Sequence, residues 1–205
     1  MALDKNPEGA RYIPVIQKVM VGCYIIMFAK EEHKEKISVI RKFKVKTGFA
    51  GMTGNKGSVA IRFNYENTSF SFINCHLESG QNTTAERMEH VRQIFNDTFN
   101  DFSVCQTQEK CFHDYKCFFG DMNFRIDLPN FEVRDLIDKK NYARLQGHDQ
   151  LINLKPQNDI LKRFVEGPLD FDPTYKYDRD CEIYDTSQKM RIPAWCDRVL
   201  FCRDK

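Results

Sequence analysis

Two short segments that alternate apolar and polar side chains constrain the fold of this chain more than any other feature. They span residues 58–65 and 68–76, and only Glu66 and Asn67 separate them. Alternation with a period of two is typical of a strand with one buried face, and a two-residue connection is typical of a tight hairpin. Strands joined in this way are antiparallel, so the chain is expected to contain an antiparallel sheet. The side chains expected to share one face within each strand are Val59, Ile61, Phe63 and Tyr65, and Phe70, Phe72, Asn74 and His76.

Further strands are expected on either side of this hairpin. Residues 19–29 form a continuous apolar run, which is too short to span a membrane and is typical of one buried strand. Residues 38–47 alternate more weakly, and residues 115–121 and 195–202 are short apolar runs. Residues 48–57 contain four of the chain's ten glycines and are predicted to form a loop.

Three segments have helical patterns. A capping box of Thr83 and Glu86 opens the first helix. Its apolar stripe would comprise Met88, Val91, Phe95 and Phe99. A second helix is expected over residues 130–140, after Pro129, and a third over residues 157–165. The second helix would bury Val133, Leu136 and Ile137. Helices mixed with hairpins predict an α+β fold with a largely antiparallel or mixed sheet.

The composition bounds the class of protein. With 205 residues, of which 41% are hydrophobic and 29% are charged, the chain is expected to fold as one globular domain. A net charge of +2 argues against a strongly basic nucleic-acid binder. The eight cysteines include no CxxC pair, and no apolar leader segment precedes them. We therefore expect reduced cysteines in a cytoplasmic protein, and neither a disulfide framework nor a zinc site.

The segment 118–125 (FFGDMNFR) places polar residues directly after an apolar strand. Asp121 and Asn123 are two residues apart, so in an extended segment they would project to the same side. A carboxylate and an amide placed in this way can orient a water molecule and stabilise charge on a phosphoryl oxygen. The alternative is an Asx turn that closes the strand.

The segment 191–200 (RIPAWCDRVL) carries charges within an apolar run. Asp197 and Arg198 closely follow the chain's only tryptophan. Buried charges are unfavourable unless they are paired. The two residues therefore belong either to a functional site or to a structural Asp–Arg pair.

Three smaller motifs could bind an anion. Asn55 and Lys56 lie between glycines (GNKG), where backbone amides can approach a phosphate, although the spacing is not that of a P-loop; the alternative is a basic hairpin turn. His76 ends a predicted strand (NCHL), where a structural role is the alternative. Residues 173–178 (PTYKYD), followed by Lys189, could also be a plain surface loop.

Together and in this order, the five motifs resemble those of the inositol polyphosphate 5-phosphatases. The order is GNKG, NCHL, FFGDMNFR, PTYKYD and PAWCDRVL, and the resemblance covers about residues 12–201. The two long motifs, at 118–125 and 191–200, are highly specific, and the segment 124–155 looks most like the synaptojanin-like members. The resemblance identifies the chain, residues 1–205, as a single and partial catalytic domain of this family.

The resemblance implies a fold, an activity and a cofactor. The fold would be a DNase-like four-layer sandwich, in which two stacked mixed sheets are flanked by helices. The activity would be Mg²⁺-dependent hydrolysis of the 5-phosphate of phosphoinositides such as phosphatidylinositol 4,5-bisphosphate, or of soluble inositol polyphosphates, by direct attack of water. The expected partners are a phosphoinositide headgroup or an inositol polyphosphate and, transiently, the cytosolic face of a membrane. No nucleic acid is expected.

Matching the motifs residue by residue assigns roles. Asp121 would orient or deprotonate the water, and Asn123 would stabilise the phosphate. His76 would contact the scissile phosphate, and Asp197 would support the catalytic centre. The residues expected to bind substrate are Asn55, Lys56, Arg125, Tyr175, Lys176 and Lys189. Among these, the tyrosine and the last two lysines would hold the neighbouring 4-phosphate.

The chain departs from the family pattern mainly at its ends. Family members begin with an Asn motif and a Gln-Glu motif, whose Glu is a principal Mg²⁺ ligand, and end with a Ser-Asp-His segment whose His is catalytic. The first two motifs do not occur before Tyr12, and no Ser-Asp-His segment follows PAWCDR, whereas Phe119 and Ile192 are mild internal departures. We therefore expect a fold incomplete at both termini, a metal site that this chain does not define, and weak or no activity of this chain alone. The alternative hypotheses are a non-catalytic phosphoinositide-binding fragment and a nuclease of the same fold.

Overall fold

The computed structural model describes residues 9–48, 51–98 and 113–203. These residues form two compact units. Unit 1 holds the described residues up to His76, those within 93–118, and residues 201–203. Unit 2 holds residues 77–92 and 119–200.

Unit 1 opens with an antiparallel hairpin of β1 (Tyr12–Met20) and β2 (Cys23–Lys30), where a single strand was expected over residues 19–29. That expectation is wrong because the apolar run turns back on itself. Gly22 lies in the turn with φ +80°, a backbone conformation that glycine adopts without strain. The apolar run therefore supplies the end of β1 and nearly all of β2.

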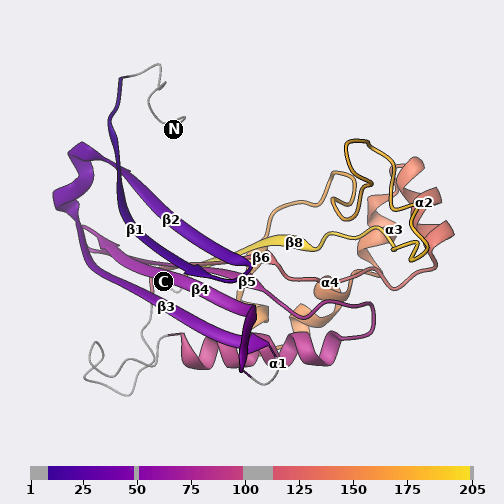
Figure 1. Cartoon of the computed structure of the whole chain (residues 1–205), viewed down its shortest axis with the longest axis horizontal. Coiled ribbons are helices and arrows are strands. Elements are labelled where there is room, and N and C mark those ends of the chain that lie inside the picture. Colours follow the sequence, from indigo (N-terminus) through magenta and orange to yellow (C-terminus); the bar gives the residue numbers. More distant parts are fainter. Residues whose placement is uncertain (1–8, 49–50, 99–112, 204–205) are drawn as a thin grey trace. The chain divides into compact units, whose positions relative to one another are not determined.

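Three longer strands follow the 3-10 helix η2 (Glu31–Lys36) and pair antiparallel. They are β3 (Ile37–Gly48), β4 (Thr53–Tyr65) and β5 (Thr68–His76). The expected two-residue hairpin is confirmed, since Tyr65 pairs with Thr68 across Glu66 and Asn67. The hairpin β1–β2 packs against these strands, so unit 1 contains two sheets in contact (Figure 1).

The glycine-rich segment 48–57 is only in part the loop that its composition predicted, since residues 51–52 form a turn and residues 49–50 lie outside the described residues. β4 begins at Thr53, so the GNKG motif lies within a strand. Gly57 pairs with Lys46 on one side and with His76 on the other. An added Cβ at Gly57 would lie 2.0 Å from the carbonyl oxygen of Val45. Here glycine permits a close approach of two strands, and it does not indicate a loop.

The buried face of β5 is the one opposite to Phe70, Phe72, Asn74 and His76, which share a face as expected. Ser71, Ile73 and Cys75 are buried, whereas the other face, with Phe70 and Phe72, is only half-buried. The two phenylalanines stack on the ring of Phe63, with ring centroids 5.4 and 6.0 Å away. An aromatic stack therefore covers the half-buried face of β5, while small and β-branched residues occupy its buried face.

The six-stranded sheet has the order β3-β4-β5-β6-β8-β7. β6 (Tyr115–Asp121) has the predicted bounds, β8 covers Asp197–Arg203, and β7 is the two-residue strand Val165–Glu166. The helix α1 (Thr84–Asp97) is confirmed and buries Val91, while Phe99 of its expected stripe lies outside the described residues. The chain passes from one unit to the other within α1, β6 and β8.

Unit 2 is built on helices around the chain's only tryptophan. α2 (Asn130–Asp138) buries the three predicted side chains, and two short helices follow, α3 (Tyr142–Gln146) and α4 (Gln150–Leu154). The helix expected over 157–165 is wrong, because this stretch forms two 3-10 turns, η3 (Lys155–Gln157) and η4 (Leu161–Arg163), and then enters β7. Trp195 is fully buried, and its indole N–H donates to the carbonyl of Phe171 (3.1 Å). An α+β fold with two sheets and flanking helices is thus confirmed. No helix within the described ranges is long and apolar enough to cross a membrane.

Candidate active site

In unit 1, the end of β5 places His76 beside a buried lysine. Lys56 is 7% exposed, and its Nζ lies 2.8 Å from Nε2 of His76. Lys56 reaches the imidazole because Gly57, its neighbour, pairs with His76 across β4 and β5. The predicted loop position of Lys56 is therefore wrong, because the residue lies within β4. An ammonium group that donates to Nε2 leaves the ring proton on Nδ1.

The tip of the β1–β2 hairpin lies against the same histidine. A Cβ added at Gly22 would lie 3.1 Å from Nδ1 of His76 and 3.5 Å from the carbonyl oxygen of Asn55. The side chain of Asn55 is exposed and accepts a hydrogen bond from Oγ1 of Thr53 (2.6 Å). Asn55, Lys56 and His76 therefore gather at one end of unit 1.

In unit 2, the chain leaves β6 at Asp121 and turns sharply. Asn123 has φ +56°, and the N–H groups of Met122 and Asn123 both donate to the carbonyl of Cys196 (2.8 and 3.2 Å). The N–H of Asn123 also donates to Oδ1 of Asp121 (3.1 Å), which is the Asx-turn bond considered from the sequence. The expectation that the two residues share one side of an extended segment is wrong, because the turn at residues 122–123 brings them together instead.

The amide of Asn123 is held from both ends. Its Nδ2 donates to the carbonyl of Leu77 (3.2 Å), and its Oδ1 accepts from Nη2 of Arg125 (2.7 Å). Nε of Arg125 donates to the backbone carbonyl of Asn123 (3.0 Å), and its guanidinium lies 4.4 Å from the ring centroid of Tyr175. Arg125, predicted to bind substrate, thus also connects Asn123 to Tyr175.

Two buried residues that sequence reasoning missed support this cluster. Oε1 of Gln150 accepts from the N–H of Arg125 (3.0 Å) and from Nη2 of Arg87 (2.7 Å). Arg87 is fully buried, and its Nη1 also donates to the carbonyls of Glu78 and Gly80. Burial first, and then the positive charge of Arg125, lower the pKa of Arg87 to about 10. The sequence signal for Arg87 was weak, because an arginine on a helix is usually exposed.

Arg198 is paired with carboxylates far away in the sequence. Its Nη1 contacts both carboxylate oxygens of Asp149 (2.9 and 3.0 Å), and its Nε and Nη2 contact Glu166 (2.6 Å each). Burial raises the pKa of Asp149, and the Arg198 charge opposes this rise. The alternative of a structural pair between Asp197 and Arg198 is therefore wrong. The side chain of Asp197 is exposed at the start of β8.

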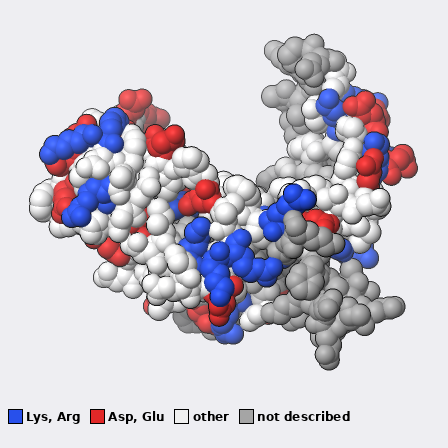
Figure 2. All heavy atoms as spheres, turned by 180° about the vertical axis from the view of Figure 1, so that it is seen from behind, with Lys and Arg blue, Asp and Glu red and all other residues white. Residues whose placement is uncertain are grey.

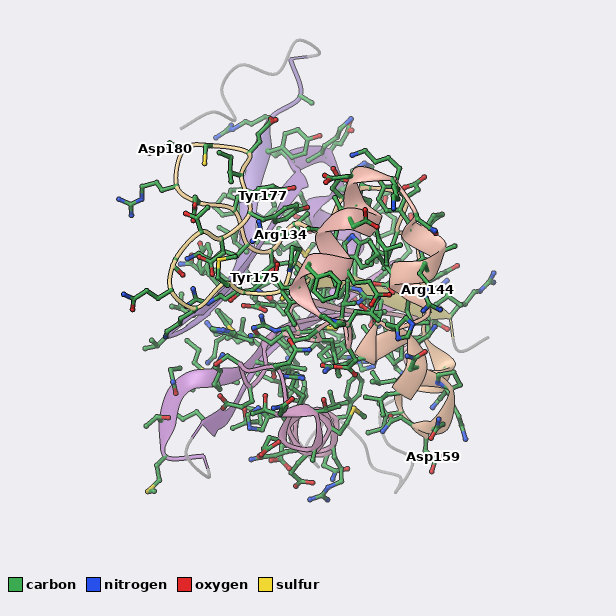
Figure 3. All side chains as sticks on the ribbon, turned by 90° about the vertical axis from the view of Figure 1, so that its right-hand side faces the viewer. Arg134, Arg144, Asp159, Tyr175, Tyr177 and Asp180 are labelled. Atoms are coloured by element: carbon green, nitrogen blue, oxygen red, sulfur yellow. The ribbon has the colours of Figure 1, made fainter. Side chains whose placement is uncertain are left out.

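The remaining predicted residues are Tyr175, Lys176 and Lys189, which lie on the segment 173–191 of unit 2. Figure 3 labels Tyr175 and Tyr177 of this segment. The backbone of Tyr175 exchanges two hydrogen bonds with Ala194 (3.1 and 2.8 Å). Lys176 and Lys189 are exposed, and neither ammonium group has a partner among the described residues. Two unpaired ammonium groups on one folded segment are suited to bind an anion.

Within residues 9–48, 51–98 and 113–203, no group of three or more His, Cys, Asp or Glu side chains is placed to hold a metal ion. Asp121 and Asn123 supply oxygen ligands of the kind that Mg²⁺ prefers. By themselves, however, they do not make a complete metal site.

Comparisons with known proteins agree with these motifs. The family Endonuclease/Exonuclease/phosphatase family 2 matches residues 1–205. Synaptojanin-1 of Rattus norvegicus is 42% identical over 195 residues, which are 95% of this chain and 12% of that protein. Inositol polyphosphate 5-phosphatase K of Mus musculus is 39% identical over 93% of this chain and 40% of its own length.

A solved structure gives the same assignment. The inositol polyphosphate 5-phosphatase domain of SPsynaptojanin, in complex with inositol (1,4)-bisphosphate and a calcium ion, matches with a TM-score of 0.86 and 35% identity. The match covers 98% of this chain and 58% of that one, so the chain spans less than two thirds of the relatives it matches. The expected fold class is thereby confirmed, and the chain belongs to the inositol polyphosphate 5-phosphatases of the endonuclease/exonuclease/phosphatase family.

Proposed function

We propose that this chain carries much of the substrate site of an enzyme that hydrolyses the 5-phosphate of phosphoinositides, such as phosphatidylinositol 4,5-bisphosphate, or of soluble inositol polyphosphates. The observation that carries the proposal is the fixed amide of Asn123 beside the carboxylate of Asp121. The inositol (1,4)-bisphosphate in the related structure supports this substrate class, because that molecule has the 4-phosphate and lacks the 5-phosphate.

The geometry of Asn123 suits it to stabilise a phosphoryl oxygen. An amide nitrogen has two hydrogens, and the carbonyl of Leu77 takes one of them. Nη2 of Arg125 donates a hydrogen bond to the amide oxygen, and this bond fixes the orientation of the Asn123 side chain. The second hydrogen is left to donate to an oxygen on which negative charge develops, and a donor fixed before the reaction needs no reorganisation.

Asp121 and His76 complete the proposed chemistry. The Asp121 carboxylate accepts the proton of the attacking water, whose oxygen then bonds to phosphorus as the bond to the inositol oxygen breaks. His76, whose Nε2 lies 2.8 Å from Nζ of Lys56, is the residue proposed to contact the scissile phosphate. Asp197 remains a prediction for a supporting role.

Mg²⁺ is part of the proposal as the cofactor, and it would neutralise phosphate charge. The family supports a metal, and the related structure contains a calcium ion. The described residues contain no group of three His, Cys, Asp or Glu side chains that could hold the ion.

The two unpaired lysines favour a substrate with a 4-phosphate. We expect the double change Lys176→Ala and Lys189→Ala to weaken binding of inositol (1,4)-bisphosphate roughly 100-fold, because two charge-assisted hydrogen bonds are lost. Isothermal titration calorimetry measures this affinity. The matched control is Lys139→Ala with Lys162→Ala, two lysines of unit 2 already paired with acids. Equal affinity of the two double variants would contradict the 4-phosphate assignment.

The proposal places this protein in the cytoplasm, where it would contact the cytosolic face of a membrane transiently. Exposed apolar side chains support it, since Val19, Val21 and Met52 of unit 1 are 60%, 72% and 67% exposed. Gly22, which follows Val21, lies against His76. Insertion of the hairpin tip would therefore bring the proposed catalytic histidine to the headgroups.

A glutamate at the hairpin tip tests this contact. We expect Val21→Glu to weaken binding to vesicles of anionic lipid about tenfold or more, because an apolar contact is replaced by a charge. Vesicle co-sedimentation measures the effect. Val165→Glu, at an exposed valine of β7, should leave binding unchanged, and an equal loss in both variants would count against the tip.

The mixed surface charge supports the expectation of no nucleic-acid partner. Figure 2 shows Lys and Arg side chains interspersed with Asp and Glu on the visible face, in keeping with the net charge of +2. A second candidate function, phosphoinositide binding without turnover, is favoured by one observation, namely that the unpaired lysines are present without a complete metal site in the described residues. Saturable, 4-phosphate-dependent binding without phosphate release would identify it.

A further inference from the structure

A buried carboxylate lies between the two segments that carry the unpaired lysines. Asp185 is fully buried, and its backbone N–H donates to the carbonyl of Lys176 (3.0 Å). Its carboxylate accepts from the N–H of Ser187 (3.2 Å), the N–H of Arg191 (2.9 Å) and Nη1 of Arg191 (3.1 Å). In the sequence, Lys189 lies between Ser187 and Arg191, whose backbone N–H groups both donate to this carboxylate. One residue thus bonds through its backbone to one lysine and through its side chain to the turn that carries the other.

Helix α2 holds the same segment from the other side. Nη2 of Arg134 donates to the carbonyl of Asp185 (2.8 Å), and Nδ2 of Asn130 donates to the carbonyls of Met190 (2.6 Å) and Arg191 (3.1 Å). Figure 3 shows Arg134 beside the segment that carries Tyr175 and Tyr177. The turn with Lys189 is therefore fixed to a helix at both of its ends.

The charge of Asp185 is satisfied within this segment. Hydrogen bonds from Ser187 and Arg191 hold the pKa of this carboxyl well below its ordinary value. The Arg191 guanidinium pairs with it, whereas Lys176 and Lys189 pair with no described residue. The buried anion therefore shapes the segment and leaves both lysine charges for a ligand.

We propose that Asp185 is a positioning residue that sets the separation of Lys176 and Lys189, and thereby the preference for an inositol phosphate with a 4-phosphate. The inference rests on the proposed function. A phosphate dianion gains from two ammonium groups only when both reach its oxygens, and small displacements of binding groups have large effects. An asparagine at this position has one oxygen in place of two, so either Ser187 or Arg191 loses its acceptor.

The test compares the affinities of two ligands that differ by the 4-phosphate. Titration calorimetry gives the ratio of the affinities for inositol (1,4)-bisphosphate and inositol 1-phosphate. Asp185→Asn should lower this ratio roughly tenfold and leave the affinity for the monophosphate unchanged. Simple electrostatics predicts the opposite sign, because removal of a negative charge strengthens anion binding. The control Asp159→Asn removes the same charge at an exposed residue of unit 2, well away from Tyr175 in Figure 3, and should leave the ratio unchanged.

A second variant keeps the inference testable if Asp185→Asn does not fold. Asn130→Ala removes the donor to residues 190 and 191 without touching either lysine, and it should also lower the ratio. A wild-type chain that binds both ligands equally would overturn the 4-phosphate site and this inference with it. A wild-type chain that prefers the bisphosphate, with an unchanged preference in both variants, would overturn the positioning role alone.

Discussion

Replacement of Arg198 by methionine is expected to lower the free energy of unfolding by about 3–5 kcal/mol. The change leaves Asp149 and Glu166 without their cation, and Asp149 is fully buried. An unpaired buried charge is far less favourable than either a buried pair or an apolar replacement of the whole cluster. Urea denaturation measures the loss.

The same variant should show a distinct pH dependence. Without Arg198, burial raises the pKa of Asp149 further above that of the unfolded chain. A carboxyl with a raised pKa binds its proton more tightly in the folded state, so its contribution to stability is present at low pH and is lost as pH rises through the folded pKa. The loss caused by Arg198→Met should therefore be smaller at acidic pH than at neutral pH.

The control is a lysine in an exposed ion pair. Lys139 contacts Asp135 (2.7 Å) on the surface of α2, and such pairs contribute at most about 1 kcal/mol. Lys139→Met should change stability little at any pH. A loss for Arg198→Met no larger than that of the control would contradict the account of a buried ionic cluster.

Substitution of Gly57 by alanine is expected to destabilise the chain by about 3 kcal/mol or more. The residue has φ +135°, which side chains rarely adopt, and its added Cβ would lie 2.0 Å from a backbone oxygen of β3. Because Gly57 also pairs with His76, a shift of β4 at this point should also disturb the contact between that histidine and Lys56. Chemical denaturation and the NMR signals of the His76 ring measure the two effects.

Gly167 provides the matched control for this substitution. An added Cβ there meets nothing within 4 Å, so Gly167→Ala should change stability by no more than about 1 kcal/mol. If Gly57→Ala were as stable as Gly167→Ala, the close approach of β3 and β4 at this point would be wrong.

Local patterns predicted the elements whose contacts lie close together in sequence. The hairpin at Glu66 and Asn67 and the buried face of α2 follow from turn length and spacing alone. The apolar run at 19–29 was misread because hydrophobicity does not show where a chain reverses, and only Gly22 marked the turn. The GNKG segment was misread because a glycine required for close strand contact looks the same in sequence as one required for a loop.

The candidate site was predictable only in part, because local patterns do not show contacts between residues that are far apart in the sequence. Asp121, Asn123 and Arg125 lie in one motif, and the structure places them in contact. The partners that hold them come from distant positions, such as Gln150, and no periodicity joins such residues. Asp185 likewise reads as a surface-loop acid in the sequence, and only its bonds to Lys176 and Arg191 give it a role.

The measurement that tests the central claim most directly is phosphate release in the presence of Mg²⁺. The substrates are phosphatidylinositol 4,5-bisphosphate and phosphatidylinositol 4-phosphate, and the enzyme is the longest natural polypeptide that contains this chain, with and without Asp121→Asn. We expect release from the bisphosphate, none from the monophosphate, and a loss of about 100- to 10,000-fold in the variant. Equal release from both lipids, or full activity of Asp121→Asn, would contradict a 5-phosphatase site built on Asp121 and Asn123.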